Sequence, residues 1–217
     1  MAKENRDGKR QSRNKNRKTR TPKLGYYLIV TDTEGTERCY FNGMYQSIPQ
    51  GMRDYLVIRT YETKTQSMVK KCKELQGTDA QYRIPWIVFD RDEVTDFDDR
   101  ILSAQKEGIH VGWSNPCFEI WMYSYFGLMP NVQTSIECCS RFATEYKRKT
   151  GRNYSKTDKY LYRNLCKYGN ERKACELAKE KMEQCLRDNK SRPSEMYPAT
   201  KVCELVKEIR EKIPYTS

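Results

Sequence analysis

Two aspartates and a glutamate follow an apolar segment near the middle of the chain. The segment PWIVF, residues 85–89, has the continuous apolar character of a buried strand, yet it runs straight into Asp90, Asp92 and Glu93. In an extended backbone the side chains at i and i+2 point the same way, so Asp90 and Asp92 would share a face about 7 Å apart at the Cα level. Carboxylates held this close repel one another unless a cation lies between them, so the spacing favours a divalent cation site.

A second acidic cluster follows the first apolar segment of the chain. YYLIVT, residues 26–31, is short and rich in strand-forming residues, and it runs into Asp32, Glu34 and Glu37. Ligands of parallel α/β sheets bind beyond the carboxyl ends of the strands, so the two clusters would meet if the two strands are neighbours. Oxygen ligands of this kind suit Mg²⁺ or Mn²⁺. The alternative is that these acids are solvated loop residues or helix caps.

Few other groups are available for catalysis. The chain has a single histidine, His110, which argues against sites built on several histidines, and nine cysteines without a C-x-x-C pair. Scattered cysteines in an odd number are unlike a secreted disulfide framework or a zinc ribbon, so the thiols are predicted to be free and mostly buried. Carboxylates must therefore carry any chemistry.

The predicted elements around these acids alternate between strands and helices. Further strands are predicted at residues 54–60 and 109–113, and helices at residues 63–77 and 96–108. Alternation of this kind, with continuous apolar strands, predicts an α/β fold of Rossmann-like type with a central, mostly parallel sheet of about four strands flanked by helices. Later helices are predicted at residues 115–126, 171–189 and 199–213.

Net charge is concentrated at the N-terminus. Residues 1–23 contain ten Lys or Arg residues and two acids, so they carry +8 of the formal net charge of +12. This stretch has no apolar periodicity and is predicted to be a disordered basic arm, which would act as a solubilising tail or neutralise the phosphates of a nucleic acid. The candidate nucleic-acid-binding residues are Lys9, Arg10, Arg13, Lys15, Arg17, Lys18 and Arg20.

The rest of the chain is predicted to form two packed parts. Residues 24–127 would be the α/β core, and residues 128–217 a helical part packed on it. No apolar run approaches the roughly 18 residues of a membrane span, and no apolar signal-peptide segment follows the basic N-terminus. We therefore expect a cytoplasmic protein that does not enter a membrane.

Four segments, in their order and spacing, resemble the RloB-like family, also called AbiLii-like abortive-infection proteins. The resemblance extends over about residues 20–210 and is most specific in the second and third segments. The segments are YLIVTDTEGTERCYF, WIVFDRDE, GIHVGWSNPCFEIW and YPATKVCELV. The resemblance implies a Toprim-type domain, a metal-dependent catalytic module also found in topoisomerases, primases and OLD-type nucleases.

The resemblance also implies roles for individual acids. It makes Asp90 and Asp92 metal ligands, with Arg91 pointing elsewhere. The family usually carries Glu-Gly-Glu after the first strand, where this chain reads Asp-Thr-Glu from residue 32 to residue 34. Asp32 would then be a ligand with Glu34 as its acid–base partner, or Glu34 would itself supply the Toprim acid. Weak, altered or partner-dependent activity is compatible with this departure.

Two further residues have a functional and a structural interpretation. Glu119 would be a further carboxylate of the site, or an acid in the first turn of a helix capped by Asn115. Lys156 would neutralise a phosphate in the transition state, or lie on a solvated helix face. The candidate catalytic residues are therefore Asp32, Glu34, Asp90, Asp92, Glu119 and Lys156, of which Asp32, Glu34, Asp90 and Asp92 are the candidate metal ligands.

By resemblance, the expected function is that of a Mg²⁺- or Mn²⁺-dependent Toprim nuclease in an antiviral abortive-infection system. An ABC/AAA-type ATPase is the expected partner protein, and self-association into a homo-oligomer stays open. RNA, including tRNA, ranks slightly ahead of DNA as substrate, although backbone contacts carry no base information. Two alternatives are a non-catalytic nucleic-acid or partner-binding module and a phosphodiesterase that acts on a nucleotide signal.

Overall fold

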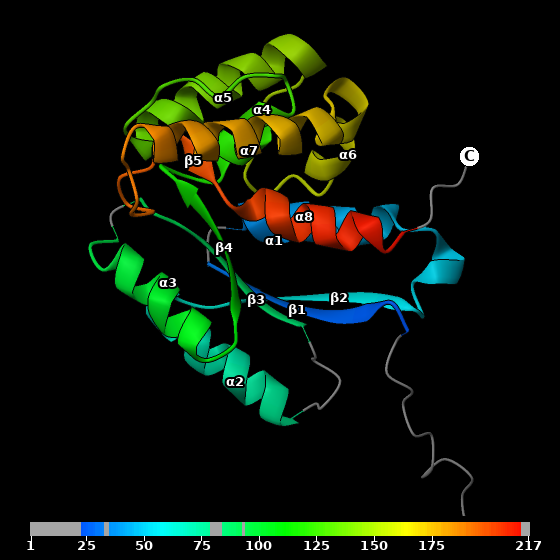
Figure 1. The fold of residues 1–217 in the computed structure, drawn as a ribbon. Coiled ribbons are helices and arrows are strands. Elements are labelled where there is room, and N and C mark those ends of the chain that lie inside the picture. The colour runs from blue at the N-terminus through cyan, green and yellow to red at the C-terminus, as the bar shows by residue number, and fades with distance from the viewer. Residues whose placement is uncertain (1–22, 33–34, 79–83, 93, 214–217) are drawn as a thin grey trace, which may run out of the picture.

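A five-stranded sheet organises the chain, and the computed structural model describes residues 23–32, 35–78, 84–92 and 94–213 (Figure 1). In space the strands lie in the order β2-β1-β3-β4-β5; the first four are parallel, and β5 is antiparallel to β4. The predicted α/β class with a mostly parallel sheet is confirmed, and β1 and β3 are neighbours. The strands are β1 Gly25–Thr31, β2 Leu56–Glu62, β3 Ile84–Asp90, β4 His110–Asn115 and β5 Ala199–Thr200.

Helices cover both faces of the sheet. Side chains alternate along β1, so Tyr27 and Ile29 pack on one face while Leu28 and Val30 pack on the other. Helices α2 and α3 cover the second of these faces, and α1 and α8 lie across the first (Figure 1). Burial on both faces explains why the strands have continuous apolar sequences. The helices are α1 Thr36–Ser47, α2 Met68–Thr78, α3 Phe97–Lys106, α4 Glu119–Ser124, α5 Ser135–Thr150, α6 Leu161–Tyr168, α7 Glu171–Arg187 and α8 Val202–Glu211.

Strand pairing shifts two predicted helix boundaries. The helix predicted from residue 199 begins at Val202 because Ala199 pairs with Asn115 at the edge of the sheet. For the same reason Asn115 ends β4 and does not cap the next helix, which begins only at Glu119. The Asn115 side-chain amide instead donates to the backbone carbonyls of residues 193 and 194, at 3.1 and 3.2 Å. The capping interpretation of Asn115 is therefore wrong.

The chain after residue 127 packs onto the sheet and onto α1. Helix α6 contacts α1, helices α5 and α7 contact α4, and β5 with α8 brings the chain back to β4 (Figure 1). None of the helices in the described ranges is long and apolar enough to span a bilayer.

An aromatic cluster around Tyr40 joins α1 to this later part of the chain. The rings that Tyr40 meets edge-on include those of Phe118, Tyr125 and Tyr162, at centroid distances of 5.4, 6.3 and 5.1 Å. The carboxylate of Glu171 accepts hydrogen bonds from the Tyr125 and Tyr162 hydroxyls, at 2.9 and 2.6 Å. Edge-to-face packing and charge-assisted hydrogen bonds together fix α1 and α4 relative to each other.

The close approach of α1 and α6 depends on the absence of a side chain at Gly43. A Cβ there would lie 2.7 Å from the Cβ of Tyr162. We expect Gly43→Ala to lower the free energy of unfolding by about 1–3 kcal/mol, the usual cost of overpacking. The matched control is Gly77→Ala in α2, where a Cβ meets nothing within 4 Å, and where alanine should stabilise by up to about 1 kcal/mol. Urea denaturation measures both, and equal midpoints for the two variants would contradict the prediction.

Candidate metal centre

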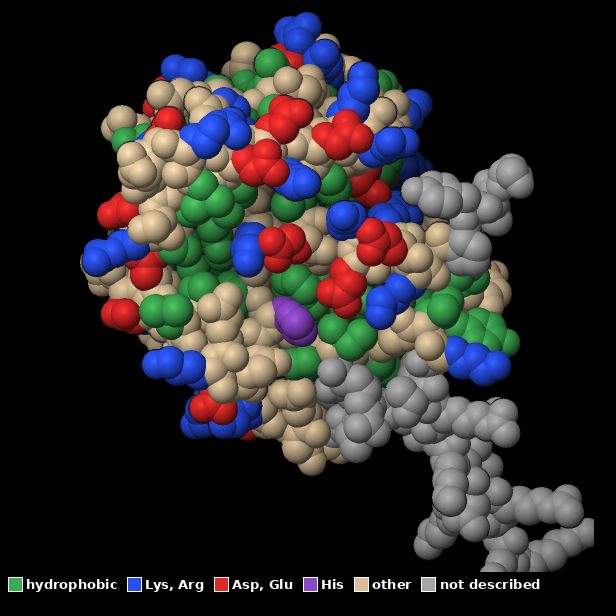
Figure 2. Space-filling model, viewed as in Figure 1, with side chains coloured by type: hydrophobic (Ala, Val, Ile, Leu, Met, Phe, Trp, Pro, Cys, Tyr) green, Lys and Arg blue, Asp and Glu red, His purple; other side chains and the backbone are tan. Residues whose placement is uncertain are grey.

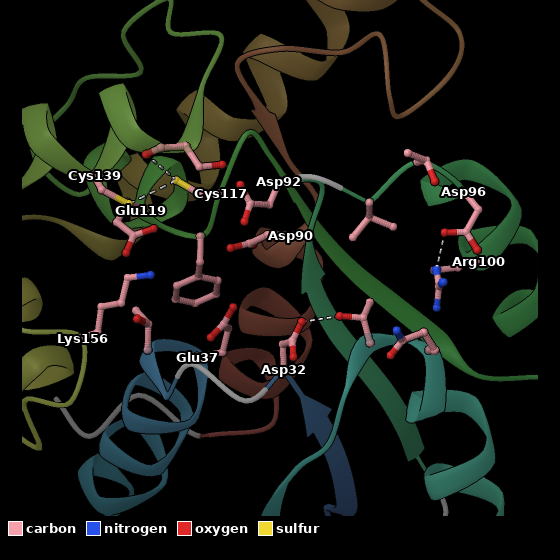
Figure 3. Close-up of a pocket in the computed structure, with 17 residues that line it drawn as sticks. Asp32, Glu37, Asp90, Asp92, Asp96, Arg100, Cys117, Glu119, Cys139 and Lys156 are labelled. Atoms are coloured by element: carbon pink, nitrogen blue, oxygen red, sulfur yellow. Dashed lines mark hydrogen bonds and ion pairs between the residues drawn. The ribbon is translucent and has the colours of Figure 1, made fainter.

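The carboxyl ends of β1 and β3, together with the segment that follows β4, line a cavity of about 360 Å³ (Figure 3). Of the candidate catalytic residues, all but Glu34 line this cavity, and Glu34 lies outside the described residues. Sequence positions more than 120 residues apart are thus brought to one site. The lining acids are Asp32, Glu37, Asp90, Asp92, Asp96 and Glu119, and the lining cations are Arg100 and Lys156.

Asp90 and Asp92 both point into the cavity, although by a different route from the one predicted (Figure 3). Asp90 ends β3, but the backbone then turns, and Asp92 has a φ of 32°. This left-handed conformation, which aspartate tolerates better than most residues, replaces the extended D-x-D that we expected. Backbone N–H groups fix the turn: Arg91 donates to Ser114 at 2.8 Å and Asp92 to Pro116 at 3.0 Å. The Arg91 side chain is not among the residues that line the cavity. This agrees with the family resemblance, which implied that Arg91 points elsewhere.

Asp32 enters the cavity from the end of β1. The register aligns Thr31 with Val88, so the residue after β1 lies beside the end of β3. The Thr65 hydroxyl, in the short 3₁₀ turn Thr65–Ser67 after β2, donates a hydrogen bond to the Asp32 carboxylate. Neighbouring strand ends therefore position and orient this carboxylate.

Glu37 is one of the acids that follow the first strand, but it is not among the candidate catalytic or metal-ligating residues predicted from the sequence. The structure places it at the centre of the acidic cluster (Figure 3). It lies in the first turn of α1, on the buried face that also carries Tyr40, Phe41 and Met44. These four positions have the i, i+3, i+4, i+7 spacing of one helix face. An acid on an otherwise apolar stripe was the sequence feature that could have identified Glu37.

Burial and repulsion by neighbouring carboxylates raise the pKa of two of these carboxyl groups, those of Glu37 and Asp90. Burial, with the negative charges of Glu119 and Asp32 nearby, raises the pKa of Glu37 from 4.5 to about 8. Burial also holds the pKa of Asp90 well above its usual range, and the charges of Glu37 and Glu119 act in the same direction. Glu37 Oε2 and Asp90 Oδ1 are buried without a hydrogen-bond partner among the described residues. Both are oxygens that a cation would satisfy.

Glu119 occupies a different wall of the cavity, beside two thiols. It is the first residue of α4 and is 2% exposed. The Tyr154 hydroxyl donates to Glu119 Oε1 at 2.7 Å, and burial raises the pKa of Tyr154, which keeps this donor protonated. The thiols of Cys117 and Cys139 lie next to it, 3.9 Å apart. Lys156, on the loop after α5, directs its ammonium group towards this wall (Figure 3).

The single histidine lies away from the cavity. His110 begins β4, so it is at the amino end of the parallel strands, whereas the acids are at the carboxyl ends. It is exposed, as Figure 2 shows, and stacks on the Trp86 ring at a centroid distance of 4.9 Å. An imidazole general base is therefore not part of this site.

The arrangement of the acids suits a hydrated hard cation. In the described part of the chain, Cys117, Glu119 and Cys139 are the only set of three acidic, cysteine or histidine side chains whose ligand atoms all lie within 4.8 Å of one another. The remaining carboxylates therefore surround the cavity without converging on one point. Mg²⁺ keeps several waters and binds through one or two carboxylates, so Asp90 and Asp92, with Asp32 opposite, fit its requirements.

Comparison with known families agrees with the motifs around these acids. The model of the RloB-like protein family matches residues 27–209, which include every described acid of the cavity. The chain belongs to the RloB-like family. No curated protein and no solved structure matches the chain. Family membership thus rests on a match over residues 27–209 and not on one motif.

Glu37 should make the metal-free protein less stable as the pH rises. Its pKa of about 8 in the folded state lies above the ordinary 4.5, so between these values the folded state binds more protons than the unfolded state. The stability contributed by the neutral carboxyl is complete below about pH 4.5 and is lost as the pH approaches 8. Glu37→Gln removes the ionisable group. The free energy of unfolding of this variant, minus that of the wild-type protein, should therefore increase across this pH interval by on the order of a few kcal/mol.

Denaturation in the presence of a chelator, at a series of pH values, measures this difference. The control is Glu180→Gln, which changes an exposed residue of α7. A stability difference for Glu37→Gln that does not change with pH would show that Glu37 ionises normally in the folded protein.

Proposed function

We propose that this protein is a Mg²⁺- or Mn²⁺-dependent nuclease of the Toprim type that hydrolyses phosphodiester bonds of nucleic acid. The observation that carries the proposal is that carboxylates from the ends of β1 and β3 and from α1 line one cavity, where Glu37 and Asp90 each have a buried oxygen without a hydrogen-bond partner among the described residues. Such a cluster is costly without a cation, because like charges and burial both oppose ionisation. Carboxyl groups with shifted pKa values in a cavity are also common at functional sites.

Five of the residues that line the cavity have a role in this proposal. Asp90 and Asp92 would hold the ion, with Asp32 as a third carboxylate from the neighbouring strand. A bound Mg²⁺ or Mn²⁺ would activate water and stabilise the charge that develops on the scissile phosphate. Glu37, whose buried Oε2 has no hydrogen-bond partner among the described residues, would offer the ion a further carboxylate oxygen from α1. Lys156, which also lines the cavity, would place a positive charge near the scissile phosphate.

Two features support a polymeric substrate. The basic arm, residues 1–23, carries +8 of the formal net charge of +12, so we assign long-range attraction for nucleic acid to it. Close to Lys156, the exposed ring of Tyr160 is flanked by Lys159 Nζ at 5.0 Å and Arg163 Cζ at 4.6 Å. An exposed aromatic ring between cations suits stacking on an unpaired base and contact with its phosphates. This favours an unpaired region of nucleic acid over a duplex. Among unpaired substrates we rank RNA, including tRNA, slightly first by resemblance to related Toprim effectors.

The cellular role is proposed from the family. By resemblance to abortive-infection proteins, the nuclease would be the effector of an antiphage system, beside an ABC/AAA-type ATPase that controls it. Asp32 stands where the family usually has Glu, which motivates a second candidate function: a binding module that has lost catalysis. Cleavage assays with and without the partner ATPase distinguish the two.

Cleavage should depend on Asp90 and on a divalent ion. We expect purified protein to cut total tRNA, mRNA or plasmid DNA with Mg²⁺ or Mn²⁺, and EDTA to abolish cutting. Asp90→Asn and Asp90→Ala should lower the rate by at least about 100-fold, the scale of losing one electrostatic group of an active site. The control is Asp188→Asn, at an exposed residue beyond α7. Binding without cleavage, even with the ATPase, would favour the binding module.

Removal of the basic arm should weaken the binding of nucleic acid more than it slows the cleavage step. Deleting residues 1–23 removes +8 of the formal net charge of +12, so affinity for RNA should fall and depend less steeply on salt concentration. A same-length arm with its seven candidate Lys and Arg residues changed to Gln is the matched control and should behave like the deletion. Fluorescence anisotropy at several salt concentrations measures both. Unchanged affinity, with unchanged turnover of a small nucleotide, would favour the phosphodiesterase alternative.

A further inference from the structure

One wall of the cavity carries a cluster that the nuclease proposal does not use. It consists of Cys117, Glu119 and Cys139 and is called here the thiol–carboxylate cluster. One ligand atom of each residue lies within 4.8 Å of the other two. Cys117 and Glu119 are 4% and 2% exposed, so two of the three side chains are shielded from bulk solvent. All three line the cavity (Figure 3).

The two sulfur atoms have the separation of a tetrahedral metal site. Cys117 Sγ and Cys139 Sγ are 3.9 Å apart. Two Zn–S bonds of about 2.3 Å at the tetrahedral angle place the sulfur atoms about 3.8 Å apart. An ion can therefore sit between these sulfur atoms without a substantial movement of either residue.

The cluster is supported by elements that fix its geometry. Cys117 lies between β4 and α4, Glu119 begins α4, and Cys139 is one turn into α5. The Tyr154 hydroxyl donates to Glu119 Oε1 at 2.7 Å, which orients the carboxylate from outside the cluster. Metal ligands in proteins are commonly oriented by such hydrogen bonds.

We propose that Cys117, Cys139 and Glu119 bind Zn²⁺ or a similar thiophilic divalent ion, with a fourth coordination position open to the cavity. Two thiolates and one carboxylate make a ligand set for Zn²⁺, whereas Mg²⁺ prefers oxygen alone. On binding, each thiol releases its proton to solvent and the sulfur donates a lone pair to the ion. Three protein ligands and one open position are typical of zinc sites that contact a substrate or water.

The proposal separates two metal sites that line different parts of one cavity. The carboxylates at the ends of β1 and β3 form the hard site, and the thiol–carboxylate cluster forms the soft one. Zinc binding at the cluster does not require the nuclease activity, so failure of one proposal does not decide the other.

Cobalt is the probe for this site, because Co²⁺ bound to thiolates in tetrahedral geometry absorbs strongly in the visible range. Reduced, full-length protein is titrated with Co²⁺ and then with Zn²⁺, in the presence of excess Mg²⁺. We expect one equivalent of tetrahedral Co²⁺, displaced by Zn²⁺ and unaffected by Mg²⁺. Cys117→Ser and Cys139→Ser should abolish the absorption, and Glu119→Gln should weaken binding by about tenfold or more.

Glu119→Gln keeps an oxygen acceptor for Tyr154, and Cys166→Ser changes an exposed thiol of α6 as the matched control. Circular dichroism confirms that each variant is folded. Retention of the full cobalt spectrum in Cys117→Ser and Cys139→Ser would assign the ion to other thiols and overturn the proposal. Absence of tetrahedral cobalt in the native protein would also overturn it, and would leave an S–H···S hydrogen bond as the reason for the short sulfur–sulfur distance.

Discussion

Repulsion between carboxylates in a partly buried cavity is the constraint on which this structure depends. Asp90 and Glu37 each lie where burial and neighbouring negative charge disfavour ionisation, and each has an oxygen without a partner among the described residues. A fold retains such a cluster only if the surrounding packing compensates for its cost, and strained or repulsive groups of this kind concentrate at functional sites. The cation that we propose for this cavity would offset that cost.

Most of the fold serves to hold these acids in place. Parallel strands bring the ends of β1 and β3 to the same edge of the sheet, and hydrophobic packing on both faces prevents the strands from shifting register. The Tyr40 cluster and the Glu171 carboxylate tie α1 to the later helices. Glu37 therefore approaches the strand ends on a rigid helix.

The cavity also has chemically distinct walls. Carboxylates at the strand ends present hard oxygen ligands, while Glu119 is accompanied by Cys117 and Cys139. Lys156 contributes positive charge beside Glu119 (Figure 3). Different preferences of metals for oxygen and sulfur would allow one cavity to distinguish two ions.

The sequence alone determined the sheet and the acids at its edge. Apolar runs ending in Asp32 and Asp90 are local features, and strand alternation with helices implies a parallel sheet whose strand ends coincide. Only the tertiary structure decided which other groups join them. Glu37 and Cys139 enter through packing of α1 and α5, and the turn at Asp92 depends on backbone hydrogen bonds to Ser114 in β4 and to Pro116 just after it. These contacts join residues far apart in the chain, and no local pattern specifies long-range contacts.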